Sequence, residues 1–493
     1  MTELEKIIET VLSNANAAFH EYRKLNGKQR AAFLRNISEE IEALGDNLIF
    51  TVMRESNLLE GRVRGEKDRT IGQMNKFADL LEEGSWLEAV IDTGDISRQP
   101  AAKPDLRKLN VPIGPVVVFG AGNFPLAFSV AGGDTASVLA GGNPVVVKGH
   151  PAHPETSKLV AGAIKAALVK SKLPEGVFEL IQDSSYESGQ LLVKHPLTKA
   201  VGFTGSQQGG RALYDLAAKR EEPIPVFAEM GSINPVVILE EALKFDNKSI
   251  AAKLVASVNL GAGQFCTNPG LIITTKTDGF NAFVSEVSTQ VKQASGAKMF
   301  SDSVFRNYKL NAQKMLMNVE VSLIEAGNEE PDSSKVMPVL AMVSAADFIS
   351  RPSLHEEVFG PFSLVVVCDS HDQLLEVVQS LKGQLTATVH AYGNELEKNK
   401  EVVAALQDRC GRLLLNGVPT GVEVCAAMQH GGPYPSSTDS RFSSVGVSAI
   451  KRFVRPVSFQ DFPQSMLPDE LKNENPLNIW RLVNNQWTKD KIN

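Results

Sequence analysis

The chain has 493 residues, more than one ordinary hydrophobic core accommodates and about right for two or three domains. Apolar residues make up 43% of the sequence and charged residues 22%, a balance typical of a folded globular protein and not of a disordered chain. Lys and Arg total 50 against 57 Asp and Glu, and the resulting formal charge of −7 excludes the broad basic surface of a general nucleic-acid binder.

The N-terminal residues mix acids with apolar side chains and contain no hydrophobic signal-peptide segment. We therefore expect a cytoplasmic protein whose mature chain starts here. The uncharged stretch 110–133 is long enough for a membrane helix, but Pro112, Pro115, Pro125 and several glycines exclude one continuous helix. We predict no membrane contact.

Apolar residues at helical spacing predict helices over much of residues 2–92, including a segment at about 28–55. Between Asp92 and Asn110 this periodicity ends, and the mixed charges and prolines there predict an extended excursion from the main core.

From Pro115 the chain alternates apolar strands with helical stretches such as 154–170 and 210–219. This βαβ rhythm predicts an α/β protein with a parallel, doubly wound sheet, followed by a second run of strands. The predicted strands are Val116–Phe119, Val145–Val147, Phe178–Ile181, Ala200–Phe203, Val226–Ala228 and Val236–Leu239, and in the second run segments near Leu271–Thr274, Phe362–Val367, Ala387–His390 and Arg412–Leu415.

A glycine-rich turn, Gly-Ala-Gly-Asn-Phe-Pro at 120–125, follows the first of these strands. It begins like the dinucleotide-binding GxGxxG pattern but has Pro125 in the last position, so that fingerprint fails. The turn is either a plain strand-to-helix connection or a place from which the Asn123 amide stabilises a developing oxyanion.

Two further strand ends carry residues suited to a phosphate-bearing ligand. Lys148 ends a buried strand, at the sheet edge where open α/β proteins bind ligands. Gly205 and Ser206 open a helix whose free backbone amides suit a phosphate, and Arg211 lies one turn further along. The alternatives are a lysine that reaches solvent and a surface arginine.

Four cysteines without a CxxC pair make neither a disulfide framework nor a structural zinc site, and we predict no metal centre. Cys266 lies on a turn in Gly-Gln-Phe-Cys-Thr-Asn-Pro-Gly, so it is either an inert buried thiol or a nucleophile. Glu229 follows an apolar strand and is either an exposed loop residue or a desolvated base with a raised pKa. Glu357 and Phe359 lie where paired acids precede an aromatic turn. If the segment has no functional role, it is a charged loop that leads into a strand.

Taken together and in order, these motifs resemble the aldehyde dehydrogenase superfamily over nearly the whole chain. The resemblance implies that Cys266 is the nucleophile, Glu229 the general base and Asn123 part of the oxyanion hole. It also implies cofactor contacts from Lys148, Gly205, Ser206, Arg211, Glu357 and Phe359.

Departures from the common family pattern indicate a subtype. Pro151 replaces the acid that in many members follows the lysine by three residues and binds the adenosine ribose. With Arg211 nearby, we predict NADP as the preferred cofactor, with NAD possible. The segment from His430 to Asp439 resembles a branch of 2-ketoglutaric semialdehyde (2,5-dioxopentanoate) and fatty aldehyde dehydrogenases. His430 is either a proton-transfer residue or a structural loop histidine.

The main prediction is oxidation of 2-ketoglutaric semialdehyde through a cysteine thiohemiacetal and thioester, with Arg409, Arg412 or Arg441 available to anchor the substrate carboxylate. The alternatives are a long-chain aldehyde dehydrogenase, a cysteine acyltransferase or hydrolase using Cys266 and His430, and a silent binding protein.

The resemblance also implies a division into domains. We expect a Rossmann-like cofactor domain at 1–92 and 113–228, a catalytic domain at 229–455, and oligomerisation segments at 93–112 and 456–493 that build a homodimer or homotetramer.

Overall fold

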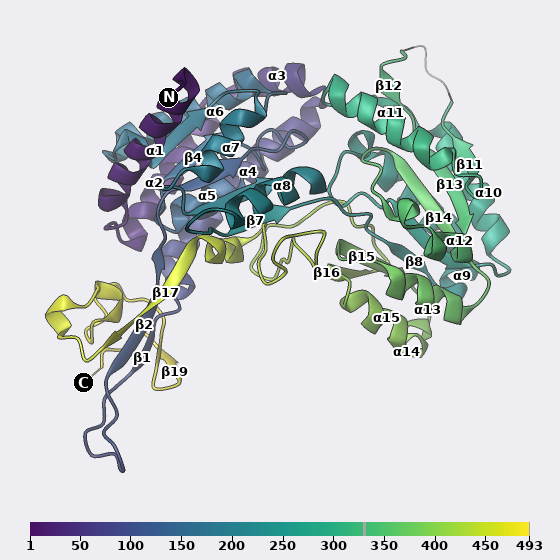
Figure 1. The fold of residues 1–493 in the computed structure, drawn as a ribbon. Helices are drawn as coiled ribbons and strands as arrows, with labels where there is room; N and C mark the ends of the chain where they lie inside the picture. Colours follow the sequence, from purple (N-terminus) through teal and green to yellow (C-terminus); the bar gives the residue numbers. More distant parts are fainter. Residues whose placement is uncertain (329–331, 493) are drawn as a thin grey trace.

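The computed structural model describes residues 1–328 and 332–492. Two α/β bodies lie next to each other, and a narrow arm of β-strands projects from the first (Figure 1). The predicted α/β class with two largely parallel sheets is confirmed.

The first body is built on a five-stranded parallel sheet in the order β5-β4-β3-β6-β7. The valines of β3 and β4 are fully buried, as expected for strands covered by helices on both faces. The strand order reverses between β3 and β6, and open α/β sheets bind their ligands beyond the carboxyl ends of the strands at such a point. The strands are β3 (Val116–Phe119), β4 (Val145–Lys148), β5 (Phe178–Ile181), β6 (Ala200–Thr204) and β7 (Val226–Glu229).

Helices surround this sheet and share one large apolar core with it. The N-terminal helices are set by side-chain caps, as in α1, where Thr2 and Glu5 form a capping box. The helices are α1 (Glu3–Tyr22), α2 (Gly27–Ala43), α3 (Gly45–Ser56), α4 (Glu60–Glu83), α5 (Gly133–Ala140), α6 (Pro154–Ser171), α7 (Tyr186–Lys194) and α8 (Gln207–Ala218).

The second body has a seven-stranded sheet in the order β11-β13-β14-β9-β8-β15-β16, in which only the edge strand β11 runs antiparallel to its neighbour. A small ribbon of β10 (Ala297–Lys298) and β12 (Lys335–Val336) lies apart from it. The strands of the large sheet are β8 (Val236–Ile238), β9 (Leu271–Thr275), β11 (Ser322–Ala326), β13 (Val339–Ser344), β14 (Phe362–Cys368), β15 (Gln384–His390) and β16 (Cys410–Leu415).

Helices again cover this second sheet, and two apolar clusters form its core. They are α9 (Glu240–Asn259), α10 (Phe280–Gln293), α11 (Asp302–Leu316), α12 (Ala345–Ser350), α13 (His371–Ser380), α14 (Glu395–Lys398) and α15 (Lys400–Gln407).

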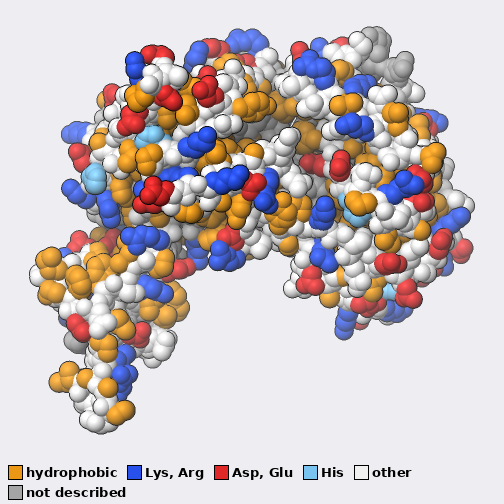
Figure 2. All heavy atoms as spheres, viewed as in Figure 1, with side chains coloured by type: hydrophobic (Ala, Val, Ile, Leu, Met, Phe, Trp, Pro, Cys, Tyr) orange, Lys and Arg blue, Asp and Glu red, His pale blue; other side chains and the backbone are white. Residues whose placement is uncertain are grey.

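The arm is a five-stranded sheet in the order β17-β2-β1-β18-β19, built from segments far apart in the sequence. It joins the predicted excursion to the C-terminal tail, and its surface carries many apolar side chains (Figure 2). The strands are β1 (Val90–Asp92), β2 (Leu106–Pro112), β17 (Val454–Gln460), β18 (Arg481–Val483) and β19 (Gln486–Thr488).

One segment of the predicted catalytic range, 229–455, lies elsewhere. The 3-10 helix η5 (Val447–Phe453) contributes Ala449, Ile450 and Phe453 to the core of the first body, because the chain has already crossed back before it enters the arm.

Among the described residues, no helix is long and apolar enough to cross a membrane. The cytoplasmic location stays a prediction.

Candidate active site

Cys266 lies on a tight turn between α9 and β9, where the backbone of Gly261, Ala262 and Gly263 has positive φ angles. The residue as a whole is partly buried. The buried amide of Asn234 fixes this turn, since its Nδ2 donates to the carbonyl oxygens of Cys266 and Asn268, both at 2.9 Å.

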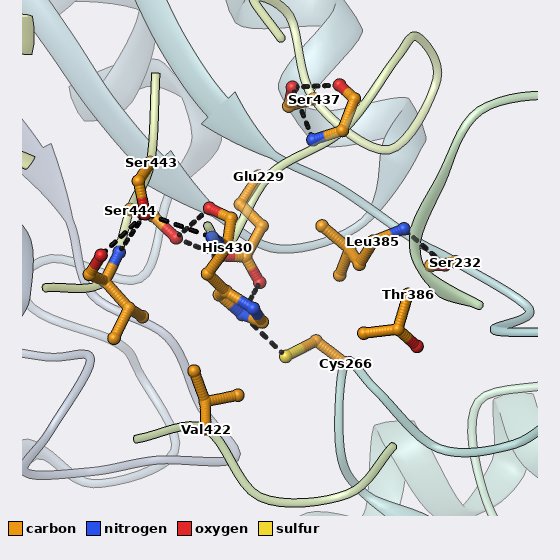
Figure 3. A network of polar contacts seen from close by, with 12 residues as sticks. Glu229, Ser232, Cys266, Leu385, Thr386, Val422, His430, Ser437, Ser443 and Ser444 are labelled. Carbon is orange, nitrogen blue, oxygen red and sulfur yellow. Dashed lines mark hydrogen bonds and ion pairs between the residues drawn. The ribbon is translucent and has the colours of Figure 1, made fainter. Parts of the chain in front are cut away.

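Glu229 and His430 meet at the sulfur of Cys266 (Figure 3). The Nε2 atom of His430 is 3.3 Å from Sγ of Cys266 and 3.0 Å from Oε1 of Glu229. Glu229 ends β7, whereas His430 lies in the irregular segment between β16 and η5. The hydroxyl of Ser444 donates to the other oxygen of Glu229, and it lies 3.0 Å from the His430 carbonyl oxygen.

Burial and neighbouring charge shift the acidities of this cluster in opposite directions. Burial raises the pKa of the Cys266 thiol well above its usual range, and the nearby Glu229 carboxylate raises it further. Burial also acts to raise the pKa of Glu229. The charge and hydrogen bond of His430, with hydrogen bonds from Ser444 and Cys266, outweigh this effect and hold that pKa below its ordinary value. The expectation of a raised pKa for Glu229 is therefore wrong.

Asn123 faces the cysteine turn from the first body. Its Nδ2 donates to the carbonyl oxygen of Gln264 at 3.1 Å, two residues before Cys266. The turn that carries Asn123 is held by the buried carboxylate of Glu66 in α4, which accepts from the amides of Leu126 and Ala127 at 2.9 and 3.0 Å. The Asn123 amide therefore lies beside the turn that carries the sulfur, where it can serve an oxyanion.

The predicted cofactor residues at the first sheet stand at strand ends. Lys148 ends β4, is partly buried, and donates from Nζ to the Asp183 carbonyl oxygen at 2.9 Å. Gly205 follows β6, and Ser206 caps the N-terminus of α8 by accepting from the Gly209 amide at 3.2 Å. The exposed Arg211 is paired with Asp215 at 2.9 Å.

Glu357 and Phe359 line a cavity that Phe265, next to the candidate nucleophile, also lines. The surroundings of Glu357 remove water from its carboxyl and raise its pKa to about 7, although its side chain is not fully covered. This carboxyl accepts a hydrogen bond from the Ser232 backbone, and its oxygens are suited to accept further hydrogen bonds from sugar hydroxyls. The strand-order reversal and the N-terminus of α8 are features that suit a dinucleotide.

The structure thus brings Cys266, Glu229, His430 and Asn123 together, while the cofactor candidates divide between the first sheet and the cavity that Glu357 lines. Sequence reasoning missed Ser444, which carries no motif of its own, and it assigned no role to Asn234, although the quoted Glu-Met-Gly-Ser-Ile-Asn-Pro segment contains it. The ligand atoms of Glu229, Cys266 and His430 lie within 4.8 Å of one another, a spacing that could also hold a metal ion.

Two curated relatives cover nearly the whole chain. Alpha-ketoglutaric semialdehyde dehydrogenase 2 of Azospirillum brasilense is 45% identical over 96% of this chain and 90% of its own length. Alpha-ketoglutaric semialdehyde dehydrogenase of Acinetobacter baylyi is 44% identical over 98% of this chain and 92% of its own length.

Solved structures with low sequence identity share the fold. Betaine aldehyde dehydrogenase of Staphylococcus aureus, solved with NAD+, is 18% identical over 93% of this chain and 90% of its own, with a TM-score of 0.78. GapN of Methanocaldococcus jannaschii, a glyceraldehyde-3-phosphate dehydrogenase solved with NADP, is 18% identical over 92% and 94%, with a TM-score of 0.76. Residues 3–456 match the aldehyde dehydrogenase family, and with these relatives the match shows that the chain belongs to this family.

Proposed function

We propose that the protein oxidises 2-ketoglutaric semialdehyde to 2-ketoglutarate, with Cys266 as nucleophile. The observation that carries the chemistry is the contact of the Cys266 thiol with His430, beside Glu229 and facing Asn123. The two relatives at 44–45% identity, both named for this semialdehyde, support the substrate.

The first task of the site is to ionise a thiol whose raised pKa opposes ionisation. Because the same nitrogen of His430 faces both neighbours, it either accepts the thiol proton or donates to Glu229, but not both at once. In our proposal the unprotonated nitrogen takes the proton, and Glu229 stabilises the imidazolium that results. The thiolate then attacks the aldehyde carbon.

Asn123 and the backbone amide of Cys266 donate to the oxygen of the thiohemiacetal that this attack forms. After the thioester has formed, Glu229 removes a proton from a water molecule. This water attacks the thioester carbon and releases the acid. The low pKa of Glu229 keeps its carboxylate ionised and ready to accept that proton at neutral pH.

We propose that Lys148 and Glu357 hold the cofactor riboses, that Gly205 and Ser206 receive its pyrophosphate, and that Phe359 completes the cofactor contact. When bound, NAD(P) supplies the acceptor for the hydride of the aldehyde. We propose NADP as the preferred form, since no acid stands at Pro151 and Arg211 lies in the first turns of α8. Asp215 competes with a 2′-phosphate for this arginine.

We also propose that the arm, with the segments 93–112 and 456–493, joins copies of the chain into a homodimer or homotetramer. Several of its large apolar side chains are open to solvent, as Ile96 is at 94% and Trp487 at 58%. An apolar surface of this kind favours association.

The test is an aldehyde screen that follows reduced-cofactor absorbance with NAD and with NADP. We expect 2-ketoglutaric semialdehyde to give the highest kcat/KM among carboxylate-bearing and aliphatic aldehydes, and Cys266→Ala to abolish the signal. Persistent activity in that variant would refute the nucleophile. A preference for long aliphatic aldehydes would instead favour the fatty aldehyde alternative.

The cofactor preference has its own test. Arg211→Ala should lower kcat/KM for NADP more than for NAD, whereas Asp215→Asn should raise it for NADP by freeing the arginine. A strong NAD preference that neither substitution changes would overturn the proposal.

A further inference from the structure

Arg69 is a cation without an anionic partner close to the reacting sulfur. It lies in α4, and its Nη1 donates to the Val422 carbonyl oxygen at 2.7 Å. Its Nε and Nη2 atoms are buried and make no hydrogen bond, and no described carboxylate forms an ion pair with it. Leaving two donors of a charged group unsatisfied is costly, so such a pair needs an explanation.

The surroundings of Arg69 lead directly to the active site. Its guanidinium lies over the ring of Phe128 at 5.5 Å, and that ring contacts the imidazole of His430, with 6.3 Å between ring centroids. Val422, whose carbonyl it holds, is drawn in the same close-up as Cys266 and His430 (Figure 3). The charge of Arg69 also opposes the rise in the pKa of Cys266.

We propose that Arg69 binds the carboxylate at the far end of the aldehyde substrate through Nε and Nη2. These two atoms form one edge of the guanidinium fork, which matches the two oxygens of a carboxylate in a bidentate pair. The proposal rests on the function proposed above, and it names the group that distinguishes a semialdehyde from an uncharged aldehyde.

Arg412 supports this assignment because it is a second arginine that binds the loop of Val422 and has an unpaired buried donor. It lies in β16, donates to the carbonyl oxygens of Gly421 at 3.0 Å and Pro419 at 2.6 Å, and also has a buried Nε without a partner. The segment 416–429, to whose carbonyl oxygens both arginines donate, has no helix or strand. Because the free edge of Arg69 is closed to solvent, this loop must shift to admit the substrate.

The other two arginines considered from the sequence are less suitable. Arg441 is exposed and its charge is paired with Asp439 at the surface, where water screens it. Arg409 is partly buried and donates to the Gln379 carbonyl oxygen at 2.9 Å, away from the cysteine turn.

The experiment compares Arg69→Met and Arg69→Lys with the matched control Arg64→Met. Arg64 lies in the same helix but pairs with Asp46 and Glu60 on the surface. We expect Arg69→Met to raise KM for 2-ketoglutaric semialdehyde by about 10–100-fold, the value of a charge-assisted hydrogen bond. kcat/KM for pentanal should change less than about threefold, and Arg69→Lys should fall in between because it keeps the charge without the fork.

A second readout is the inhibition constant of 2-ketoglutarate, which should rise in parallel with KM in Arg69→Met. The thermal midpoints of all variants, compared with the wild type, report whether the substitutions leave the fold intact. Equal losses on both aldehydes in a folded variant would overturn the anchor and leave Arg69 as a support of the loop. A wild-type enzyme that oxidises pentanal as well as the semialdehyde would instead overturn the proposed substrate.

Discussion

At the scale of single residues, the reactivity of Cys266 depends on partners that remove its proton. Burial and the Glu229 carboxylate both oppose ionisation of the thiol, and His430 is the neighbour placed to accept the proton. In the proposed mechanism, this contact provides the route by which a thiol with a raised pKa loses its proton.

This geometry predicts the behaviour of His430→Gln. General acid–base groups contribute about a hundredfold or more, so kcat should fall by at least that factor and its dependence on pH should change. The rate of iodoacetamide alkylation of Cys266 should fall as well, which separates thiolate formation from later steps. An unchanged pH–rate profile with unchanged alkylation would remove the proton-transfer role.

Glu357 predicts a pH dependence of stability. Its pKa is raised from 4.5 to about 7 in the folded protein, so the folded state binds more protons than the unfolded chain between these values. Stability should therefore fall as pH rises from about 4.5 to 7, by the contribution of this group. Glu357→Gln should show a smaller fall in thermal midpoint over that window than the wild type, and equal slopes would contradict the assignment.

At the scale of elements, a buried polar network ties the cysteine turn to the second sheet. Asn234, just before β8, reaches the Cys266 carbonyl, and its own oxygen accepts from Thr386 in β15 at 2.9 Å. Gln384 at the start of β15 accepts from the amides of Ile233 and Asn234 at 2.8 and 3.2 Å. The network sets the position of the nucleophile because every member is buried and satisfied by the others.

Asn234→Ala should accordingly lower both stability and activity. It removes several buried hydrogen bonds and a residue whose φ of 45° suits asparagine, at a cost of about 1–3 kcal/mol or more. We expect a lower thermal midpoint and a drop in kcat of about tenfold as the sulfur moves out of position. Thr386→Val, which removes one donor and keeps the shape, is the control, and a larger effect in Thr386→Val would contradict this account.

At the scale of the whole molecule, the arm leaves the two bodies and presents apolar side chains to solvent (Figure 2). Its outer strand β19 has an unpaired edge beside Trp487, which is 58% exposed. An open strand edge with an aromatic side chain is costly for a single chain and favours pairing with another.

Sedimentation of the wild type should therefore give the mass of a dimer or larger assembly, and Trp487→Glu should shift it toward the monomer. Tyr186→Glu, at a residue of the first body that is 91% exposed, is the matched control. A monomeric wild type would overturn the role of the arm.

Local patterns were sufficient for much of this protein. The strands over Val116–Phe119 and Phe178–Ile181 have the predicted limits, because a short apolar run between turn residues is typical of a buried strand. The cysteine turn and the lysine at the end of β4 could be located for the same reason. The arm strands and β13 were missed. Long-range pairing accounts for the arm, where β1 pairs with β18 near the end of the chain, whereas β13 pairs with the nearby β14.

What the sequence by itself determined was the α/β rhythm and the family, and it singled out Cys266 as the candidate nucleophile. The tertiary structure decided which polar groups lie near it: His430, which contacts its sulfur, lies 164 positions from Cys266, and Arg69 comes from a helix in the other body. Such contacts depend on how the two cores pack and on where an irregular loop returns to the site. Residue periodicity reports local structure and predicts neither of these. The tertiary structure therefore points to Arg69, with Arg412 nearby, as the proposed substrate anchor in place of Arg409 and Arg441.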